Sequence, residues 1–411
     1  GRPKMTDLSQ LYTKKQQEVL RFYYNNDFSI LILHGAKRTG KTVLDIDLFV
    51  SELRKIRKEA DRMRVISPQY ILAGASLGSV RRNIINELEN RYGITIKLNI
   101  ENAFYLFGVK VCCFGHDDIG CLGIIRGMTA WGAFINEATM ANREVFDEIV
   151  SRCSAGNAKI LVDTNPGDPL HWLKVNYIDK ADRKKIVDFS FKLEDNTFLT
   201  KRYIENIKAT TPTGVFYDRN IKGLWVTPDG VVYVDYNHDK HVINSLQGFN
   251  FEKYVAGVDW GYEHNGVIVI LGITDKKEFV LIKEISRKHE DVDSFWLPKA
   301  LKIKELFGDI IFYCDSARPE YVEKFINAGL NACNANKAVL EGITDVATLI
   351  KSNRFFVYSK GIANFEKEIY SYVWADGKDE PVKKNDDTMD GLRYAIHSEL
   401  SDFDKAMAIE G

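Results

Sequence analysis

The stretch of sequence that decides the fold of this chain is Gly35-Ala36-Lys37-Arg38-Thr39-Gly40-Lys41-Thr42. It matches the pattern G-x-x-x-x-G-K-S/T in full and lies between an apolar strand, Ile30 to Leu33, and an amphipathic helix. In that setting the glycines let backbone N–H groups turn inward around phosphate oxygens, and the helix N-terminus adds positive potential. We expect Lys41 to reach the outer phosphates and Thr42 to offer its hydroxyl to Mg2+. The stretch therefore predicts a P-loop that binds a nucleoside triphosphate such as ATP.

A second apolar strand, Ala133 to Ile135, ends in Asn136 and Glu137. P-loop enzymes place an acidic residue after such a strand, where it orients the attacking water, and a carboxylate beside it helps to position Mg2+. We expect Glu137 to orient the water; a surface carboxylate at a strand end is the alternative. Asn136 stands where an aspartate usually acts through the water shell of Mg2+. Its neutral amide predicts a weaker electrostatic contribution.

Three further side chains are candidates for the nucleotide site. Arg38 lies inside the loop and Arg126 lies ten positions before Asn136. Either is a candidate for stabilising charge on the transferring phosphoryl group, within the subunit or from a neighbouring one. An arginine that faces solvent or DNA is an equally good interpretation of each. Gln16 precedes the P-loop strand and is predicted to hydrogen-bond an adenine edge, with a solvated helix N-terminus as the alternative.

Apolar strands alternate with amphipathic helices from Phe28 to Cys153. This alternation predicts a mainly parallel sheet covered by helices, which is the α/β architecture of a P-loop NTPase domain. Two strands that meet at Gly108 predict a hairpin, an antiparallel addition to the sheet. The expected helices follow Lys41 and Ser79, and the expected strands are Ser29 to Leu33, Met63 to Ile66, Phe104 to Phe107, Val109 to Phe114, Ala133 to Ile135 and Lys159 to Val162.

The chain is long enough for two domains. Its 411 residues exceed one ordinary compact core, and a composition of 45% hydrophobic and 27% charged residues is typical of globular proteins. Thr227-Pro228-Asp229-Gly230 interrupts the helical pattern. We therefore predict a first domain over residues 1–226, a linker with entry strands over residues 227–250, and a second domain over residues 251–411.

The composition narrows the class of protein. No apolar run approaches the roughly 20 residues needed to span a bilayer, and the N-terminus lacks the apolar core of a signal peptide, so we expect a cytoplasmic protein without a membrane partner. The six cysteines show no C-x-x-C spacing, which argues against a zinc site and a disulfide framework. The net charge of -1 argues against non-specific coating of nucleic acid but allows local basic patches.

The second domain opens with three strands joined by short polar connections. These predict an antiparallel meander, after which helices and strands alternate. The expected strands are Tyr254 to Asp259, Val267 to Ile273, Glu278 to Ile285, Ile310 to Cys314 and Arg354 to Tyr358, and the expected helices begin at Ser294, Pro319 and Thr344, followed by two closing helices.

Carboxylates end several of these elements. Asp259 ends the first strand of the meander, and Asp315 follows a later strand in the same way, so the two can converge. Asp390 lies in the last long helix; the helix dipole explains Asp386 or Asp387 at its start, but not Asp390. Oxygen ligands from Asp259, Asp315 and Asp390 suit a pair of Mg2+ or Mn2+ ions that activate water. The layout is ribonuclease-H-like and predicts phosphodiester hydrolysis.

The order of these motifs resembles that of the large terminase subunit of tailed bacteriophages, over nearly the whole chain. The segments that carry the resemblance are the P-loop, Asn136-Glu137, Thr164-Asn165-Pro166, His171-Trp172, Gly223-Leu224-Trp225, Asp259, Asp315 and Asp390-Gly391-Leu392-Arg393-Tyr394. The resemblance implies an ATPase domain that translocates DNA, followed by a ribonuclease-H-like nuclease domain. Asn136 departs from the family, which usually has aspartate there.

The resemblance also implies roles and partners. Thr164-Asn165-Pro166 would couple ATP hydrolysis to movement, and Arg126 would act as an arginine finger on a neighbouring subunit of a homo-oligomeric ring. The implied partners are double-stranded DNA, the small terminase subunit and the portal protein of the procapsid. The implied location is the host cytoplasm, with transient binding at the portal vertex. A helicase-nuclease of DNA repair or recombination and a non-catalytic scaffold with degenerate sites are the alternatives.

Overall fold

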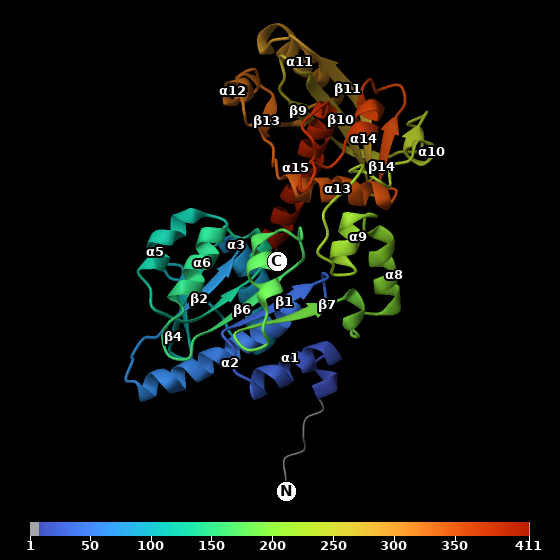
Figure 1. Ribbon diagram of the computed structural model, residues 1–411. Coiled ribbons are helices and arrows are strands. Elements are labelled where there is room, and N and C mark those ends of the chain that lie inside the picture. Colours follow the sequence, from blue (N-terminus) through green and yellow to red (C-terminus); the bar gives the residue numbers. More distant parts are fainter. Residues whose placement is uncertain (1–7, 411) are drawn as a thin grey trace. The chain divides into compact units, whose positions relative to one another are not determined.

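The computed structural model describes residues 8–410, with the side chains of residues 8–402. The chain forms two compact units, each with its own sheet and core (Figure 1). The first unit contains the chain up to Ile204 together with Asp218–Val226. The second contains Glu205–Tyr217 and the chain from Thr227 onward.

Residues 205–217 lie in a different unit from the one that the sequence predicts for them. Phe216 packs in the core of the second unit, where its ring lies 6.1 Å from that of Trp374. The Thr213 hydroxyl donates to Asp235 at 2.7 Å. These long-range contacts attach the segment to the second unit, although it precedes the break at Thr227 in the sequence.

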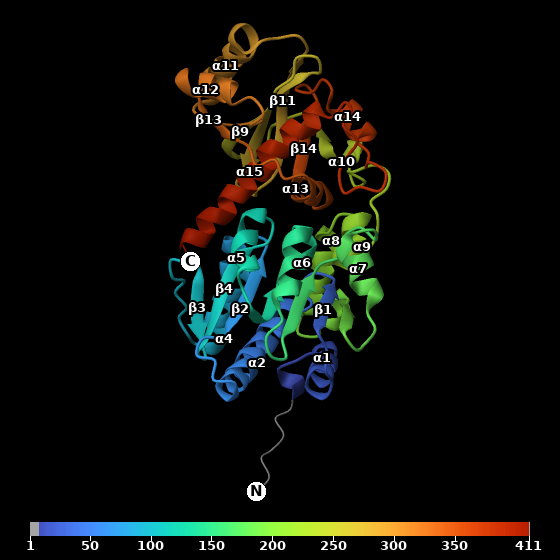
Figure 2. The same ribbon diagram turned by 60° about the vertical axis from the view of Figure 1, so that its left-hand side comes forward.

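A seven-stranded sheet forms the centre of the first unit, in the order β3-β4-β2-β5-β6-β1-β7 (Figures 1 and 2). All neighbours are parallel except β3 and β4, which form the predicted antiparallel hairpin. The predicted mainly parallel α/β fold is therefore confirmed. The strands are β1 (Ile30–Gly35), β2 (Gln69–Gly74), β3 (Ala103–Leu106), β4 (Val109–Gly115), β5 (Ala130–Ile135), β6 (Lys159–Thr164) and β7 (Ile186–Phe191).

Cores on both faces of this sheet explain why Ile30 to Leu33 of β1 are all apolar. Leu31 and Leu33 point into one core and Ile30 and Ile32 into the other, because successive side chains of a strand alternate between faces.

Among the described residues, no helix combines the length and apolar character needed to cross a membrane. Residues 8–226 form the helices α1 (Lys14–Asn25), α2 (Lys41–Arg62), α3 (Leu77–Val80), α4 (Asn86–Tyr92), α5 (Leu122–Arg126), α6 (Arg143–Arg152), α7 (Trp172–Asn176), α8 (Lys201–Thr210) and α9 (Val215–Asn220). The same residues form a π-helical turn, η2 (Arg81–Ile85), and short 3-10 turns at Leu8–Gln10, Ile119–Cys121, Ala138–Met140, Ile178–Lys180 and Leu193–Asp195.

The first sheet departs from the sequence prediction at two strands. The strand predicted over Met63 to Ile66 is wrong: α2 continues to Arg62, and the side chains of Met63 and Ile66 are 57% and 91% exposed. The buried strand in this region is β2, which begins at Gln69. Strand β7 is missing from the prediction because polar side chains interrupt its apolar pattern, yet it pairs with β1 along its whole length.

A second seven-stranded sheet, in the order β13-β12-β9-β10-β11-β14-β8, forms the centre of the second unit. The predicted meander of β9, β10 and β11 is antiparallel as expected, and the other neighbours are parallel. The prediction misses β13 and begins α13 at Thr344 instead of Val339. The elements are α10 (His238–His241), β8 (Val242–Ile243), β9 (Phe251–Asp259), β10 (Gly266–Thr274), β11 (Phe279–Arg287), a π-helical turn η7 (Val292–Trp296), α11 (Leu297–Phe307), β12 (Ile311–Cys314), α12 (Pro319–Asn327), β13 (Asn331–Asn334), α13 (Val339–Lys351), β14 (Phe355–Tyr358), α14 (Phe365–Ser371) and α15 (Asp387–Glu410).

The absence of a side chain at Gly257 allows α15 to lie directly against β9. A Cβ atom at Gly257 would lie 2.0 Å from the carbonyl oxygen of Gly391, which is too close for any side chain. Asp390 precedes Gly391 on the helix, and Asp259 follows Gly257 at the end of the strand. The close approach therefore brings the acidic start of α15 next to the carboxyl end of β9.

We expect Gly257→Ala to lower the free energy of unfolding of the second unit by about 1–3 kcal/mol, because the added methyl group must push α15 away from β9. Gly391→Ala is the matched control, since its Cβ would lie 3.7 Å from the Gly257 carbonyl oxygen, an ordinary contact. Denaturant unfolding followed by tryptophan fluorescence measures both. Equal stability of the two variants would contradict the packing described here.

Candidate functional site

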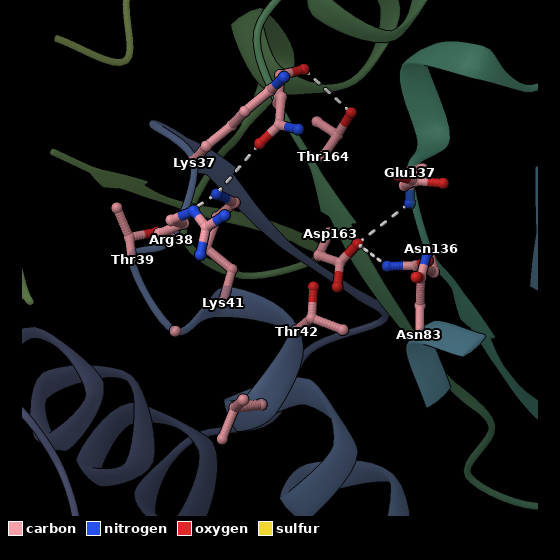
Figure 3. A pocket seen from close by; sticks show the side chains of 13 residues that line it. Lys37, Arg38, Thr39, Lys41, Thr42, Asn83, Asn136, Glu137, Asp163 and Thr164 are labelled. Carbon is pink, nitrogen blue, oxygen red and sulfur yellow. Dashed lines mark hydrogen bonds between the residues drawn. The ribbon is translucent and has the colours of Figure 1, made fainter. Parts of the chain in front are cut away.

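The P-loop runs from the end of β1 into the first turn of α2. Gly35 has a φ of 131° and a Cβ there would lie 2.1 Å from the carbonyl oxygen of Phe191, so only glycine fits. Gly40 adopts the left-handed conformation at the N-cap of α2, with a φ of 83°. The loop borders a cavity of about 580 Å³ (Figure 3), which is lined by Lys37, Arg38, Thr39, Gly40, Lys41, Thr42, Val43, Asn83, Asn136, Glu137, Asp163, Thr164 and Asn165.

Lys41 is buried within the loop. Its ammonium group donates to the carbonyl oxygen of Gly35 at 3.1 Å and to the side-chain oxygen of Asn165 at 3.4 Å. Burial lowers the pKa of Lys41 to about 8, although the neighbouring Asp163 favours the charged form. The contact with Asn165 joins the P-loop to the Thr164-Asn165-Pro166 segment, which lies beside the cavity at the end of β6.

A carboxylate that the sequence analysis does not single out, Asp163, lies in the wall of this cavity (Figure 3). Its Oδ1 atom accepts hydrogen bonds from the Asn136 amide at 2.6 Å and from the Glu137 backbone N–H at 3.0 Å. Burial raises the pKa of Asp163, against the opposing effects of the Glu137 N–H and the Thr42 hydroxyl. Asp163 directly follows the predicted strand Lys159 to Val162, a position like that of Asp315, but the order of strands that brings it to the cavity cannot be read from the sequence.

Asn136 and Glu137 follow β5, and both line the cavity. Glu137 adopts a left-handed conformation, with a φ of 54°. The Asn136 side-chain oxygen accepts a hydrogen bond from Asn83 at 3.3 Å, and its backbone carbonyl oxygen lies 2.7 Å from Nε2 of His116. Burial lowers the pKa of His116, which favours the neutral imidazole. The turn after β5 is thus held by side chains from three other segments.

The two predicted arginines lie in different surroundings. Arg38 lines the cavity, and its guanidinium group lies over the ring of Tyr203, 5.6 Å from the centroid. Arg126 ends α5 and does not line the cavity of its own chain. Its side chain is 58% exposed and lies 3.6 Å from the carboxylate of Glu148. The structure therefore brings Arg38 to the P-loop cavity and leaves Arg126 on the surface.

Gln16 supports the P-loop from outside the cavity. Its amide donates to the carbonyl oxygen of Gly40 at 3.0 Å, and its side-chain oxygen accepts from the Thr13 backbone N–H at 2.9 Å. The Thr13 hydroxyl completes a capping box at the start of α1. Gln16 is buried, so the alternative of a solvated helix N-terminus is wrong. Its contact with an adenine edge stays a prediction.

In the second unit, Asp259 and Asp315 meet at one edge of the sheet. Strands β9 and β12 are parallel neighbours, and the backbone N–H of Asp315 donates to the carbonyl oxygen of Val258 at 2.8 Å. Asp390 comes from α15, which lies against β9. Burial, followed by the charges of Asp390 and Asp315, raises the pKa of Asp259 well above its ordinary value. The three predicted carboxylates therefore share one electrostatic environment.

Cations offset part of this negative charge. Lys337 donates to Asp315 at 2.7 Å, and Arg393 donates to Asp390 at 2.8 Å. Among the described residues, the Asp259 carboxylate has neither an ion pair nor a hydrogen bond. A buried carboxylate without a partner is costly in its ionised form. The cluster thus leaves the Asp259 carboxylate without a paired cation of its own.

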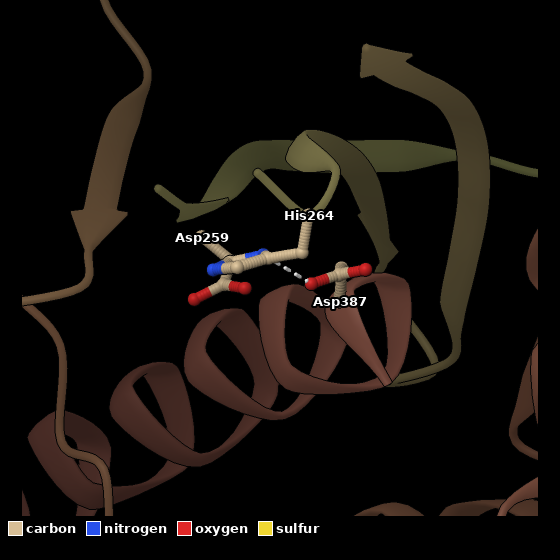
Figure 4. Close-up of side chains that lie close together, drawn as sticks. All are labelled: Asp259, His264 and Asp387. Atoms are coloured by element: carbon tan, nitrogen blue, oxygen red, sulfur yellow. Dashed lines mark hydrogen bonds and ion pairs between the residues drawn. The ribbon is translucent and has the colours of Figure 1, made fainter. Parts of the chain in front are cut away.

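A histidine adds a nitrogen to this cluster. One ligand atom each from Asp259, His264 and Asp387 lie within 4.8 Å of one another (Figure 4). The Nδ1 atom of His264 lies 2.7 Å from the Asp387 carboxylate. Carboxylate oxygens suit Mg2+ and Mn2+, whereas an imidazole nitrogen favours a divalent transition metal. Asp387 thus has a role beyond the helix dipole, and His264 was not foreseen because it lies in the connection between β9 and β10, which has no periodic pattern.

Comparisons with known proteins agree with this architecture. The sequence matches the family described as "Terminase large subunit, T4likevirus-type, N-terminal" over residues 35–235. The large terminase of a thermophilic bacteriophage is 26% identical, with a TM-score of 0.80, over 93% of this chain and 98% of that one. Its complexes with ADP and with ATP-gamma-S match over 95% of this chain and 99% of theirs, at the same identity and TM-score. No curated protein matches the sequence.

Fold and sites together define a P-loop NTPase unit joined to a ribonuclease-H-like unit in one chain. The P-loop lies within the matched family region, and the likeness to the terminase of the thermophilic phage extends through both units. The chain therefore resembles the large terminases of bacteriophages in both sequence and fold.

We expect Asp259→Asn to stabilise the metal-free protein by about 0.5–2 kcal/mol, because an amide removes like-charge repulsion from a buried cluster. Mn2+ should raise the melting temperature of the unchanged protein and have little effect on this variant, which lacks one carboxylate ligand. Thermal unfolding in EDTA and in Mn2+ measures both effects. Asp376→Asn, at an exposed position of the same unit, is the control. A loss of stability in EDTA would contradict the electrostatic account.

Proposed function

We propose that this chain is the catalytic subunit of a phage DNA-packaging motor. It hydrolyses ATP to drive double-stranded DNA into a procapsid, and it cuts the concatemer with a metal-dependent endonuclease. The observation that carries the proposal is the presence, in one chain, of a P-loop cavity that includes Glu137 and of a buried carboxylate cluster around Asp259. The ADP and ATP-gamma-S complexes of the terminase from the thermophilic phage support nucleotide use, because that relative aligns with nearly the whole chain.

In the ATPase site, the P-loop N–H groups and Lys41 bind the phosphates of ATP. Thr42 offers its hydroxyl to Mg2+, which neutralises charge on the phosphates when it is bound. Glu137 lines the same cavity, and it orients and activates the attacking water. Arg38 lies in the loop, where its guanidinium group is able to stabilise charge on the transferring phosphoryl group.

In the nuclease site, the carboxylates of Asp259, Asp315 and Asp390 hold a pair of Mg2+ or Mn2+ ions, with Asp387 and His264 beside them. The donor set fits such ions, because hard oxygen ligands converge and the buried Asp259 lacks a partner. Bound ions of this kind activate water and stabilise the leaving oxygen of a phosphodiester. The mutual repulsion of the carboxylates favours cation binding at this edge of the sheet.

Packaging requires further molecules, and we extend the proposal to them. The chain assembles as a homo-oligomeric ring on the portal protein at the procapsid vertex, in the host cytoplasm, and receives DNA with the small terminase subunit. The position of Arg126 supports action on a neighbouring subunit, because its exposed side chain lies outside the cavity of its own chain.

We expect Glu137→Gln to lower the rate of ATP hydrolysis by about 100-fold or more, because the amide cannot accept a proton from water. Metal-dependent nicking of plasmid DNA should persist in this variant. Asp315→Asn should have the opposite pattern, with nicking lost and ATP hydrolysis retained. Colorimetric phosphate release and gel assays on the same preparations measure the two activities. Joint loss of both in either folded variant would contradict two separate sites.

A translocating motor should move along DNA without separating its strands. We therefore expect the protein with Asp315→Asn, which removes cleavage, to displace a triplex-forming strand from duplex DNA in an ATP-dependent manner. The same preparation should leave a forked duplex annealed. ATP-dependent release of one strand of the fork would support the helicase-nuclease alternative and contradict the packaging proposal.

A further inference from the structure

Position 136 lacks the expected carboxylate, but the neighbouring strand carries one at its end. In P-loop enzymes, the Mg2+ of the bound nucleotide is held by the loop hydroxyl and by an aspartate at the end of a nearby strand. This chain has Thr42 but carries Asn136 at the expected strand end. We propose that Asp163, at the end of β6, takes the place of that aspartate and positions Mg2+ together with Thr42. The inference rests on the proposed ATPase function.

The surroundings of Asp163 meet the requirements for this role. The residue lines the nucleotide cavity and is only 2% exposed. Strand β6 lies between β1, which leads into the P-loop, and β5, which leads into Glu137. The Oδ2 atom of Asp163 has no hydrogen-bond partner in the described part of the chain, and it is directed toward the Thr42 hydroxyl (Figure 3). A buried acceptor without a partner, beside the loop hydroxyl, is suited to a cation or its bound water.

Asn136 has a defined part in this arrangement. Its amide donates to Oδ1 of Asp163 at 2.6 Å, and the Glu137 backbone N–H donates to the same atom at 3.0 Å. These bonds fix the carboxylate so that its other oxygen faces the loop. Two carboxylates at this separation would not both ionise, because like charges at hydrogen-bond distance repel strongly. An amide beside a carboxylate therefore preserves one negative charge for the cation, on β6 instead of β5.

Other carboxylates near the loop are less suitable. Asp45 lies one helical turn after Lys41 and is completely buried, but it does not line the cavity. Glu137 lines the cavity, but it begins the turn after β5, and its backbone N–H supports Asp163. Among the residues that line the cavity, Asp163 and Glu137 are the only carboxylates, and Asp163 is the one directed at Thr42.

The test measures Mg2+-dependent nucleotide binding, which is independent of turnover. Calorimetric titration with ATP-gamma-S, in EDTA and in excess Mg2+, should show tighter binding with Mg2+ for the unchanged protein. Asp163→Asn should lose roughly 10- to 100-fold of that gain, as is typical when a residue that orients a metal's ligands is removed, with binding in EDTA unchanged. Asp61→Asn, at an exposed position near the end of α2, is the matched control and should keep the full gain.

A reciprocal variant, Asn136→Asp with Asp163→Asn, keeps one carboxylate and one amide at the pair, and it should recover the Mg2+-dependent gain. It also carries the test if Asp163→Asn alone does not fold, as judged by circular dichroism. Retention of the full gain by folded Asp163→Asn, or its loss in the folded reciprocal variant, would overturn this inference alone. Failure of the unchanged protein to bind nucleotide in either condition would overturn the proposed function as well.

Discussion

The carboxyl ends of β5, β6 and β1 lie side by side at one edge of the first sheet, and the nucleotide site depends on this order. Strand β1 supplies the P-loop, β5 supplies Glu137, and β6 places Asp163 between them. Because the central position is buried, the Asp163 carboxylate needs donors, which the Asn136 amide and the Glu137 backbone provide. The bond to Glu137 also helps to hold a left-handed conformation that costs roughly 1–2 kcal/mol in a residue with a side chain.

The second unit meets a similar constraint by different means. Its acidic residues come from β9, from the end of β12 and from α15, and the helix reaches the sheet because Gly257 has no side chain at the point of contact. The resulting density of negative charge is partly offset by Lys337 and Arg393. Asp259 retains no such partner, so burial and like charges raise its pKa. Under the proposed nuclease function, this site trades stability in the free protein for affinity toward divalent cations.

Local patterns predicted much of this architecture. The P-loop motif, the hairpin turned at Gly108 and the meander of the second unit each follow from residues that are close in sequence. Asp163 and His264 could not be found in this way. The role of Asp163 depends on which strands become neighbours, and that of His264 on the path of a connection without periodicity. The strand predicted at Met63 to Ile66 failed because a few apolar residues beyond a long helix do not reveal whether they are buried.

Asn136 shows how a single position acquires a different meaning when its neighbour in space is known. In the sequence alone, the Asn136 amide stands in place of an expected carboxylate. Taken with Asp163, it is the donor in a hydrogen bond whose acceptor is a buried acid at 2.6 Å. A second carboxylate at position 136 would have to share a proton with Asp163, and the pair would then titrate as a unit with one negative charge. The local net charge is therefore similar whether position 136 carries an acid or an amide. The Asn136 amide changes which strand presents the ionised oxygen to the P-loop. With an amide at position 136, no proton has to be shared between two carboxylates.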